Sequence, residues 1–398
     1  MLSDVYFPRI NGVSTSIETF RARLAEHGVG VDLIAPAYTG EEPQPGIERI
    51  PAWVVPGDPE DRMMQPRALR AALRRRKAEG YDLVHVQTPF LAHYAGVRAA
   101  RAWGVPVIET YHTFFEEYLF HYVPFAPSGW MRVLARRFSR SQGNAVDAVV
   151  VPSSAMRDRL REYGVESPLH VLPTGIPLAR FQARDGGAFR DRHDIERGRP
   201  VALYVGRVAH EKNIDFIVAA MARVRASLPD ALLLITGEGP ARAALEAEAR
   251  AFGLGDSVRF LGYLDRRDDL LDCYAAADLF VFASRTETQG LVLLEAMAMG
   301  LPVVALAAMG TRDVLLPASG ALTPDDDVDA FAAAMLELLA NPQRRRELGA
   351  RGRAWAESWS DDAMADRLAR LYAHALQVGV AAAPTGRSVG EDPIRSSE

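Results

Sequence analysis

The chain reads Ser284-Arg-Thr-Glu-Thr-Gln-Gly-Leu-Val-Leu-Leu-Glu295 between two short apolar runs. The run before it, Asp278-Leu-Phe-Val-Phe-Ala283, is bounded by polar residues and predicts a buried strand. Gly300 and Pro302 mark a turn into the run after it, Val303-Val-Ala-Leu-Ala307, which predicts a second strand. The order strand, loop, helix and strand places the loop at the carboxyl end of a parallel strand, where open α/β sheets bind ligands.

Glu287 and Glu295 flank the predicted start of the helix at Gly290. A helix start presents unpaired N–H groups and the positive end of the helix dipole, which suits a phosphate. Glu295 lies about a turn and a half into the helix, and its side chain leans back toward that start. Because carboxylates accept hydrogen bonds from hydroxyl groups, we expect Glu295 to bind a ribose and Glu287 to bind a transferred group. The alternative is that Glu287 caps the helix and Glu295 is a solvated surface residue.

The spacing from Glu287 to Glu295 resembles the E-x7-E signature of retaining glycosyltransferases of the GT-B fold, family four, and the resemblance extends along nearly the whole chain. It implies two Rossmann-like domains that face each other across a central cleft, and a hexose donor activated by a nucleotide diphosphate. It also implies transfer without a cofactor or an obligatory metal, by a same-face mechanism in which the leaving phosphate deprotonates the acceptor. The sequence identifies no side chain as a covalent nucleophile.

Length and composition agree with a two-domain protein. The 398 residues, 48% of them apolar, suffice for two cores of ordinary size. A net charge of −5 and a pI of about 6.0 argue against a general nucleic-acid binder. A single cysteine, Cys273, excludes a disulfide framework and fits a cytoplasmic location. We find no signal peptide and no apolar run near the roughly 18 residues that a membrane span needs, so no segment is expected to cross a membrane.

The start of the chain is similar to the family's first strand but keeps only Met1 and Leu2 of its apolar residues. A first strand is normally central in a doubly wound sheet, so we expect the short strand to weaken the N-terminal domain. Gly12 then opens an amphipathic helix that runs to Glu26. The resemblance implies that this glycine loop closes over the donor pyrophosphate, and a plain turn glycine is the alternative.

Short apolar strands alternate with amphipathic helices in both halves of the sequence, which predicts an α/β fold with parallel sheets covered on both faces. The expected strands of the first half are at residues 31–34, 82–86, 105–108, 147–151 and 169–172. Those of the second half are at residues 201–205, 231–235, 258–261, 279–283 and 303–307.

These patterns divide the chain into an acceptor domain over residues 1–176 and a donor domain over residues 177–360. A glycine- and charge-rich passage over residues 173–200 is expected to connect them. A C-terminal helix over residues 361–380 is implied by the resemblance to cross back to the N-terminal domain. The composition of residues 381–398 predicts a disordered tail.

Arg207 and Lys212 follow a predicted strand of the second domain. Two cations there could stabilise a leaving pyrophosphate in place of a divalent metal, because a charge pair at about 4 Å is worth on the order of 4 kcal/mol at an effective dielectric of about 20. The family's phosphate-binding arginine and lysine correspond to these two residues. The alternative is a local ion pair between Glu211 and Lys212.

The resemblance implies further contacts. His112 follows a strand of the first domain and would contact the donor sugar, although a lone histidine is more often structural. Gly237 lies in a loop that matches a family loop near the donor, although turn geometry alone would explain a glycine there. The expected catalytic residues are His112, Arg207, Lys212 and Glu287, and the expected donor-binding residues are Gly12, Arg207, Lys212, Gly237, Glu287, Gly290, Leu291 and Glu295.

The aromatic and acidic passage over residues 109–124 looks most like that of diacylglycerol glucosyltransferases. We therefore expect UDP-glucose as donor, with a GDP-mannose-dependent mannosyltransferase as the alternative, and a diacylglycerol-like lipid or a glycan as acceptor. Pro66–Lys77 and Trp130–Arg140 place arginines beside apolar residues, so they could lie on the anionic inner face of the cell membrane. Ordinary solvated helices are the alternative.

Two rival functions fit the same layout. A nucleotide-sugar epimerase would convert its substrate without an acceptor, and a non-catalytic binder would hold a nucleotide sugar without releasing UDP. The sequence Asp325-Asp-Asp327 could suggest the metal-binding aspartates of the other large glycosyltransferase fold. It precedes an alanine-rich helix, however, and we expect it to cap that helix.

Overall fold

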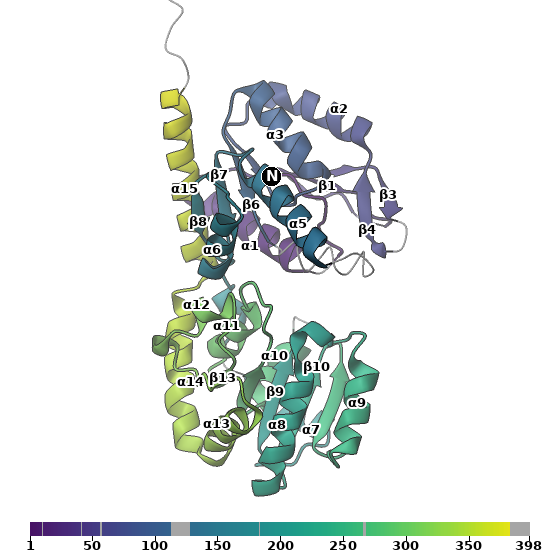
Figure 1. Ribbon diagram of the computed structural model, residues 1–398, viewed down its shortest axis with the longest axis vertical. Helices are drawn as coiled ribbons and strands as arrows, with labels where there is room; N and C mark the ends of the chain where they lie inside the picture. Colours follow the sequence, from purple (N-terminus) through teal and green to yellow (C-terminus); the bar gives the residue numbers. More distant parts are fainter. Residues whose placement is uncertain are drawn as a thin grey trace, which may run out of the picture.

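The computed structural model describes residues 1–9, 11–40, 42–55, 58–112, 128–182, 184–265 and 268–382. These residues form an N-terminal half and a C-terminal half, stacked along the long axis of the molecule (Figure 1). The part of the aromatic passage beyond His112, and the predicted tail beyond residue 382, lie outside the described residues.

A parallel sheet forms the centre of the N-terminal half. β1 pairs with β2, and the order β5-β6-β7-β8 continues the sheet, while β3 and β4 form an antiparallel hairpin beside it. The strands are β1 (Leu33–Pro36), β2 (Ile47–Ile50), β3 (Ala52–Val55), β4 (Asp58–Met64), β5 (Val84–Val86), β6 (Val107–Thr110), β7 (Ala148–Val151) and β8 (Leu169–Val171). The helices are α1 (Gly12–Leu24), α2 (Pro66–Arg76), α3 (Leu91–Trp103), α5 (Ser128–Gly143) and α6 (Ser154–Glu162).

The short N-terminal segment connects β1 to β5. Leu2 forms parallel bridges with Ile34 of β1 and with Val86 of β5. Its N–H donates to the His85 carbonyl at 2.9 Å, and its carbonyl accepts from the Gln87 N–H at 2.8 Å. The Leu2 side chain is buried in the same apolar cluster as Ile34 and Val86. The segment therefore lies in the central position expected of a first strand, with a single residue in the ladder.

The C-terminal half is built on a parallel sheet of order β11-β10-β9-β12-β13. Its strands are β9 (Val201–Val205), β10 (Leu232–Thr236), β11 (Val258–Gly262), β12 (Leu279–Phe282) and β13 (Val303–Ala305). The helices are α7 (Gly187–Arg192), α8 (Ile214–Ser227), α9 (Arg242–Ala251), α10 (Asp269–Ala276), α11 (Leu291–Ala298), α12 (Thr311–Val314), α13 (Val328–Ala340) and α14 (Pro342–Glu357).

Burial on both faces explains why these strands read as continuous apolar runs. Leu203 of β9 lies in register with Leu234 of β10 and with Phe280 of β12, and all three side chains are fully buried. Strands covered by helices on both faces need apolar residues at every position rather than at alternate ones. The predicted α/β fold with parallel sheets is confirmed.

The chain passes between the halves at residues 173–177 and returns beside that point. The Ile176 N–H donates to the Trp359 carbonyl, and the Asp361 N–H donates to the Ile176 carbonyl, both at 2.9 Å. α15 (Asp361–Ala382) then packs along α1 of the N-terminal half (Figure 1). Residues 178–200 are not a loose connection, because Phe181 and Phe189 are buried in the core of the C-terminal half.

Candidate active site

Lys212 and Glu287 form an ion pair, with 2.7 Å between the lysine Nζ and the glutamate Oε2. Lys212 ends a short 3-10 helix, His210–Lys212, that follows β9, and Glu287 lies in the loop that follows β12. Because β9 and β12 are neighbours in a parallel sheet, their carboxyl ends meet at one edge. Each side chain is 22% exposed, so the pair is partly shielded from water.

Gly290, and not Glu287, occupies the N-cap position of α11. Gly290 has a φ of 87°, and no side chain caps the helix. A left-handed φ of this size favours glycine because other residues are strained there. The capping alternative for Glu287 is therefore wrong, and its carboxylate is turned instead toward Lys212. Leu291 is the first residue of α11, directly behind this junction.

Glu295 lies in the second turn of α11 and is buried. Its side-chain Oε2 accepts a hydrogen bond from the Tyr274 hydroxyl of α10 at 3.0 Å. The residue is 5% exposed, so the alternative that it is a solvated surface residue is wrong. Its role as a ribose contact stays a prediction.

The loops that end β9 and β10 lie against each other at the same edge of the sheet. The Val208 N–H donates to the Glu238 carbonyl at 3.0 Å. Gly237 has a φ of 123°, and a Cβ on it would lie 1.9 Å from the Gly206 carbonyl oxygen. Glycine is therefore required at residue 237 by the close approach of the two loops.

Arg207 lies at the carboxyl end of β9, near Lys212 in the sequence. Its side chain is 59% exposed, and its guanidinium is 3.9 Å from the Glu211 carboxylate. An exposed pair at this distance contributes little to stability and leaves the cation available to a ligand. The alternative pair of Glu211 with Lys212 is not what forms, because Lys212 contacts Glu287.

Asn213 follows Lys212 in the sequence, Arg285 lies two residues before Glu287, and the two side chains bond to each other. The sequence analysis did not assign either of them. Asn213 has a left-handed φ of 56°, and its side-chain amide donates to the Ala283 carbonyl at 3.0 Å. Its Oδ1 accepts from Arg285, which also contacts Asp326 through two bonds of 2.7 Å. The available sequence signal was an asparagine at a loop-to-helix junction, since asparagine tolerates this backbone conformation.

One of the aspartates before α13 has the capping role expected from the sequence. The Asp327 side chain accepts from the Asp329 and Ala330 N–H groups, so its predicted role as a helix cap is confirmed. Asp326 contacts Arg285 instead. In the parts of the chain that the structure describes, no cluster of three or more His, Cys, Asp or Glu side chains could hold a metal ion.

His112 lies at the carboxyl end of β6 in the N-terminal half and is partly buried. Its Nε2 lies 3.0 Å from the Gln87 Oε1, which accepts the ring proton, so Nδ1 is left as a hydrogen-bond acceptor. Burial lowers the pKa of His112 to about 4. The ring is therefore neutral at physiological pH and suited to bind a hydroxyl rather than an anion.

Gly12 begins α1, whose start is capped by the Asn11 side chain through a 2.8 Å bond from the Ser14 N–H. Gly12 has no left-handed φ, and a Cβ on it would meet nothing within 4 Å. Neither the backbone nor a neighbour requires glycine there, so the glycine leaves free space in front of the helix. The structure thus joins Lys212 and Glu287 directly and places Gly12 and His112 in the other half.

Asp4 is a partly buried carboxyl that the sequence analysis did not assign. It accepts hydrogen bonds from the Thr88 hydroxyl at 2.8 Å and from the Ala92 N–H at 3.1 Å, and so caps the start of α3. Thr88 follows Gln87, the partner of His112, so Asp4 fixes the loop that orients this histidine. Burial raises the pKa of Asp4 to about 6 from the ordinary value of 3.8.

We expect Asp4→Asn to stabilise the protein at pH 7.5. The folded carboxyl keeps its proton up to about pH 6, so the stability of the wild type falls as the pH rises from about 4 to 6. At pH 7.5 the ionised carboxyl costs about 3 kcal/mol, which the neutral amide avoids while it still accepts the helix N–H. Thermal unfolding at pH 4 and at pH 7.5 measures the difference, with the exposed Asp230→Asn as control. A variant with the same pH dependence as the wild type would contradict this reading of Asp4.

Comparison with known proteins agrees with this architecture. Residues 187–355 match the family model described as glycosyl transferases group 1, and residues 10–180 match the model described as glycosyltransferase family 4. Sucrose-phosphate synthase from Thermosynechococcus elongatus superposes with a TM-score of 0.76 at 25% identity, over 95% of this chain and 98% of that one. The fold is therefore the GT-B fold of glycosyltransferases.

Two of the similar proteins are named as enzymes that glycosylate lipids. The alpha-monoglucosyldiacylglycerol synthase of Streptococcus pneumoniae is 34% identical over 321 residues, which cover 77% of this chain and 70% of the relative. A GDP-mannose-dependent monoacylated alpha-(1-6)-phosphatidylinositol monomannoside mannosyltransferase of Corynebacterium glutamicum is 34% identical over 256 residues, which cover 61% and 66%. The chain belongs to family 4 of the glycosyltransferases and is a hexosyltransferase.

Proposed function

We propose that this glycosyltransferase moves glucose from UDP-glucose to a diacylglycerol-like lipid, with retention of the anomeric configuration and without a metal. The observation that carries the proposal is the Lys212–Glu287 pair in front of the start of α11. The name of the pneumococcal relative supports glucose and a diacylglycerol acceptor. The name of the corynebacterial relative supports the alternative, which is transfer of mannose from GDP-mannose.

The reaction exchanges one bond of the anomeric carbon for another. The bond from this carbon to the β-phosphate oxygen breaks, and a bond to the acceptor oxygen forms on the same face of the sugar. The proton of the acceptor hydroxyl passes to the departing phosphate oxygen, so the chain needs no protein base. Its contribution is to stabilise the charge that develops on the diphosphate and to hold the sugar in place.

Lys212, Arg207 and the first N–H groups of α11 supply that charge stabilisation. An ammonium has three donors, so Lys212 can keep its bond to Glu287 and still donate to phosphate oxygens. Glu287 thereby fixes the direction of the ammonium, while its other carboxylate oxygen accepts from hydroxyl groups of the sugar. His112 contacts the sugar from the N-terminal half as a neutral ring. The N–H groups at a helix start favour an anion without any need for a metal.

We expect Lys212→Ala and Glu287→Ala to reduce transfer by at least about a thousandfold while the protein stays folded. The measurement is release of UDP or GDP from a panel of nucleotide sugars with a membrane-lipid extract, followed by mass spectrometry of the product. Glu246→Ala serves as the control, because Glu246 pairs with Arg242 within α9. Turnover near that of the wild type in either site variant would refute the site assignment.

The same measurement separates the rival functions. An epimerase would change the sugar with no acceptor present, and a binder would retain the nucleotide sugar without releasing nucleotide. Release of GDP from GDP-mannose, rather than UDP from UDP-glucose, would replace the proposed donor with its alternative. Chelation of divalent metals with EDTA is expected to leave the rate of transfer unchanged.

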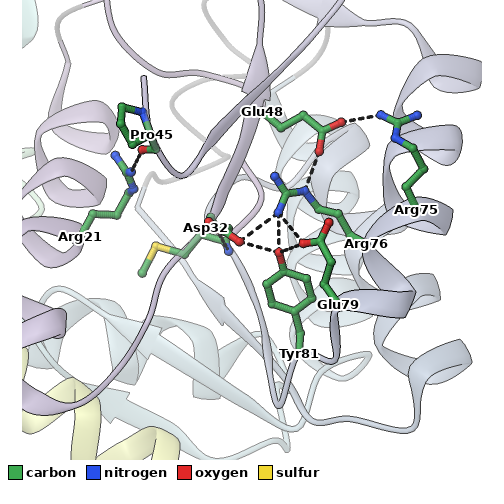
Figure 2. A network of polar contacts seen from close by, with 9 residues as sticks. Arg21, Asp32, Pro45, Glu48, Arg75, Arg76, Glu79 and Tyr81 are labelled. Carbon is green, nitrogen blue, oxygen red and sulfur yellow. Dashed lines mark hydrogen bonds and ion pairs between the residues drawn. The ribbon is translucent and has the colours of Figure 1, made fainter. Parts of the chain in front are cut away.

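We also propose that α2 brings the enzyme to its lipid substrate. In Figure 2, Arg75 and Arg76 at the end of α2 are turned toward Glu48, at 2.6 and 2.5 Å. Arg76 is bonded further to Asp32 and Tyr81 and is largely shielded, whereas Arg75 is exposed and pairs with Glu48 at the surface. Arg67, Arg70 and Arg74 are exposed and are spaced along one face of the helix, where they can meet an anionic surface.

The N-terminal half also has exposed apolar side chains. Trp53 of β3 and Met63 of β4 are cross-strand partners, and each is 50% exposed just before the start of α2. On α5, Val133 and Leu134 are more than half exposed, while Phe138 packs inward. A basic face and exposed apolar side chains in the same half of a protein suit the headgroup region of an anionic bilayer. No helix in the described ranges is long and apolar enough to cross a membrane.

We expect the double charge reversal Arg70→Glu and Arg74→Glu to abolish sedimentation of the protein with vesicles of anionic lipid at low salt. Each reversal replaces an attraction of about 1 kcal/mol by a repulsion. The matched control is Arg346→Glu with Arg353→Glu on α14, which makes the same change in net charge on the other half. Equal sedimentation of both variants, or none for the wild type, would show that α2 does not face the membrane.

A further inference from the structure

Gln289 connects the loop of Glu287 to the segment that joins the two halves. Its Oε1 accepts from the Thr174 N–H at 2.9 Å, and its Nε2 donates to the Thr174 carbonyl at 2.7 Å. The side-chain amide thus pairs with both backbone groups of one residue, as a neighbouring strand would. Thr174 and Gln289 are 115 residues apart in the sequence.

The contact continues into the N-terminal half through a hydroxyl. The Thr174 Oγ1 donates to the Ser16 Oγ of α1 at 2.9 Å. Ser16 lies about one turn after Gly12, on the helix whose glycine loop is expected from the family resemblance to close over the donor diphosphate. Ser16, Thr174 and Gln289 are 1%, 7% and 6% exposed, so water does not compete for these bonds. We call this set the Ser16–Thr174–Gln289 link.

We infer that the Ser16–Thr174–Gln289 link sets the position of the donor loop relative to α1, and that Gln289 is a positioning residue for the donor. The inference rests on the proposed function. Gln289 lies between Glu287, which would hold the sugar, and Gly290, which begins the phosphate-facing helix. Displacement of Gln289 therefore moves the groups on either side of it. The link also fixes how far Gly12 stands from that helix start.

The chemistry of the link requires an amide. Only a side chain with one donor and one acceptor can satisfy the N–H and the carbonyl of Thr174 together. A glutamate would place a carboxylate oxygen against the carbonyl, and a methionine would leave both backbone groups without a partner. Because these groups are buried, the unpaired state is costly, and the loop is expected to shift until the groups reach water.

The test is Gln289→Met, a substitution of similar length and volume without hydrogen-bonding groups. We expect the dissociation constant for UDP or GDP, whichever the wild type binds, to rise at least about tenfold in calorimetry. The KM for the nucleotide sugar is expected to rise with it, while the KM for the lipid acceptor stays within about twofold of the wild type, because Gln289 lies in the loop between Glu287 and Gly290, the residues proposed to hold the donor.

Asn144→Leu is the matched control. The Asn144 amide makes the same kind of contact, with its Oδ1 accepting from the Glu166 N–H at 2.7 Å and its Nδ2 donating to the Gly164 carbonyl at 3.2 Å. It joins parts of the N-terminal half alone. We expect it to lower the unfolding temperature without changing the nucleotide dissociation constant.

A second pair of variants tests the link without touching the donor loop. Ser16→Ala and Thr174→Val each remove the same bond between α1 and the segment that joins the halves, so each is expected to weaken nucleotide binding about threefold. The double variant is expected to be no weaker than either single one, because the effects of two partners in one bond are not additive. These variants decide the question if Gln289→Met fails to fold.

The possible outcomes distinguish failure of the proposed function from failure of the positioning role of Gln289. Wild-type protein that binds neither UDP nor GDP would refute the proposed function and the inference together. Wild-type binding with an unchanged dissociation constant in Gln289→Met and in both single variants would refute the positioning role alone. An equal rise of the donor and acceptor KM values would make Gln289 a general structural residue, which also overturns the inference.

Discussion

The adjacency of β9 and β12 is the constraint on which the site depends. The two strands are joined in sequence by β10, β11 and their helices, yet they pair in the sheet, and this brings Lys212 within 2.7 Å of Glu287. An exposed ion pair is worth about 0–1 kcal/mol, and a shielded one also loses hydration, so stability is a weak reason for the pair. The stronger effect of the pair is to orient the two charged side chains. The ammonium and the carboxylate fix each other in front of α11, and neither long side chain has to be ordered when a ligand binds.

Local rules account for the parts of the site that the sequence predicted. Gly290 reveals a helix start because the left-handed backbone favours glycine, and Asp327 reveals a cap because a short acceptor before an alanine-rich helix binds free N–H groups. The Asn213–Arg285 contact and the bond of Gln289 to Thr174 follow no local rule. They depend on which strands are neighbours and on where the halves meet, and a pattern of apolar residues does not contain that information.

In the N-terminal sheet, the short first segment at Leu2 is accompanied by a contact between the neighbouring strand β5 and the C-terminal helix α15. Its central position is held by Leu2, and the next strand, β5, carries the buried His85. The His85 Nδ1 lies 2.5 Å from the Tyr372 hydroxyl of α15, and its Nε2 lies 2.7 Å from the Thr110 hydroxyl of β6. Burial holds the pKa of His85 well below its ordinary value, so the ring stays neutral and can accept from one hydroxyl while it donates to the other. The last helix of the chain thereby supports the sheet that the first residues complete.

The same return of the chain limits how the halves can move. Ile176 pairs with Ser360, and a Cβ on Gly175 would lie 2.5 Å from the Asp361 backbone, so the outgoing and returning segments touch without room between them. A rotation of one half against the other has to bend both segments at this point. Thr174 lies two residues before Ile176 and carries the bonds to Gln289 and Ser16. Any such rotation therefore acts first on the contact that positions the donor loop, which couples the relative position of the two halves to the geometry of the site.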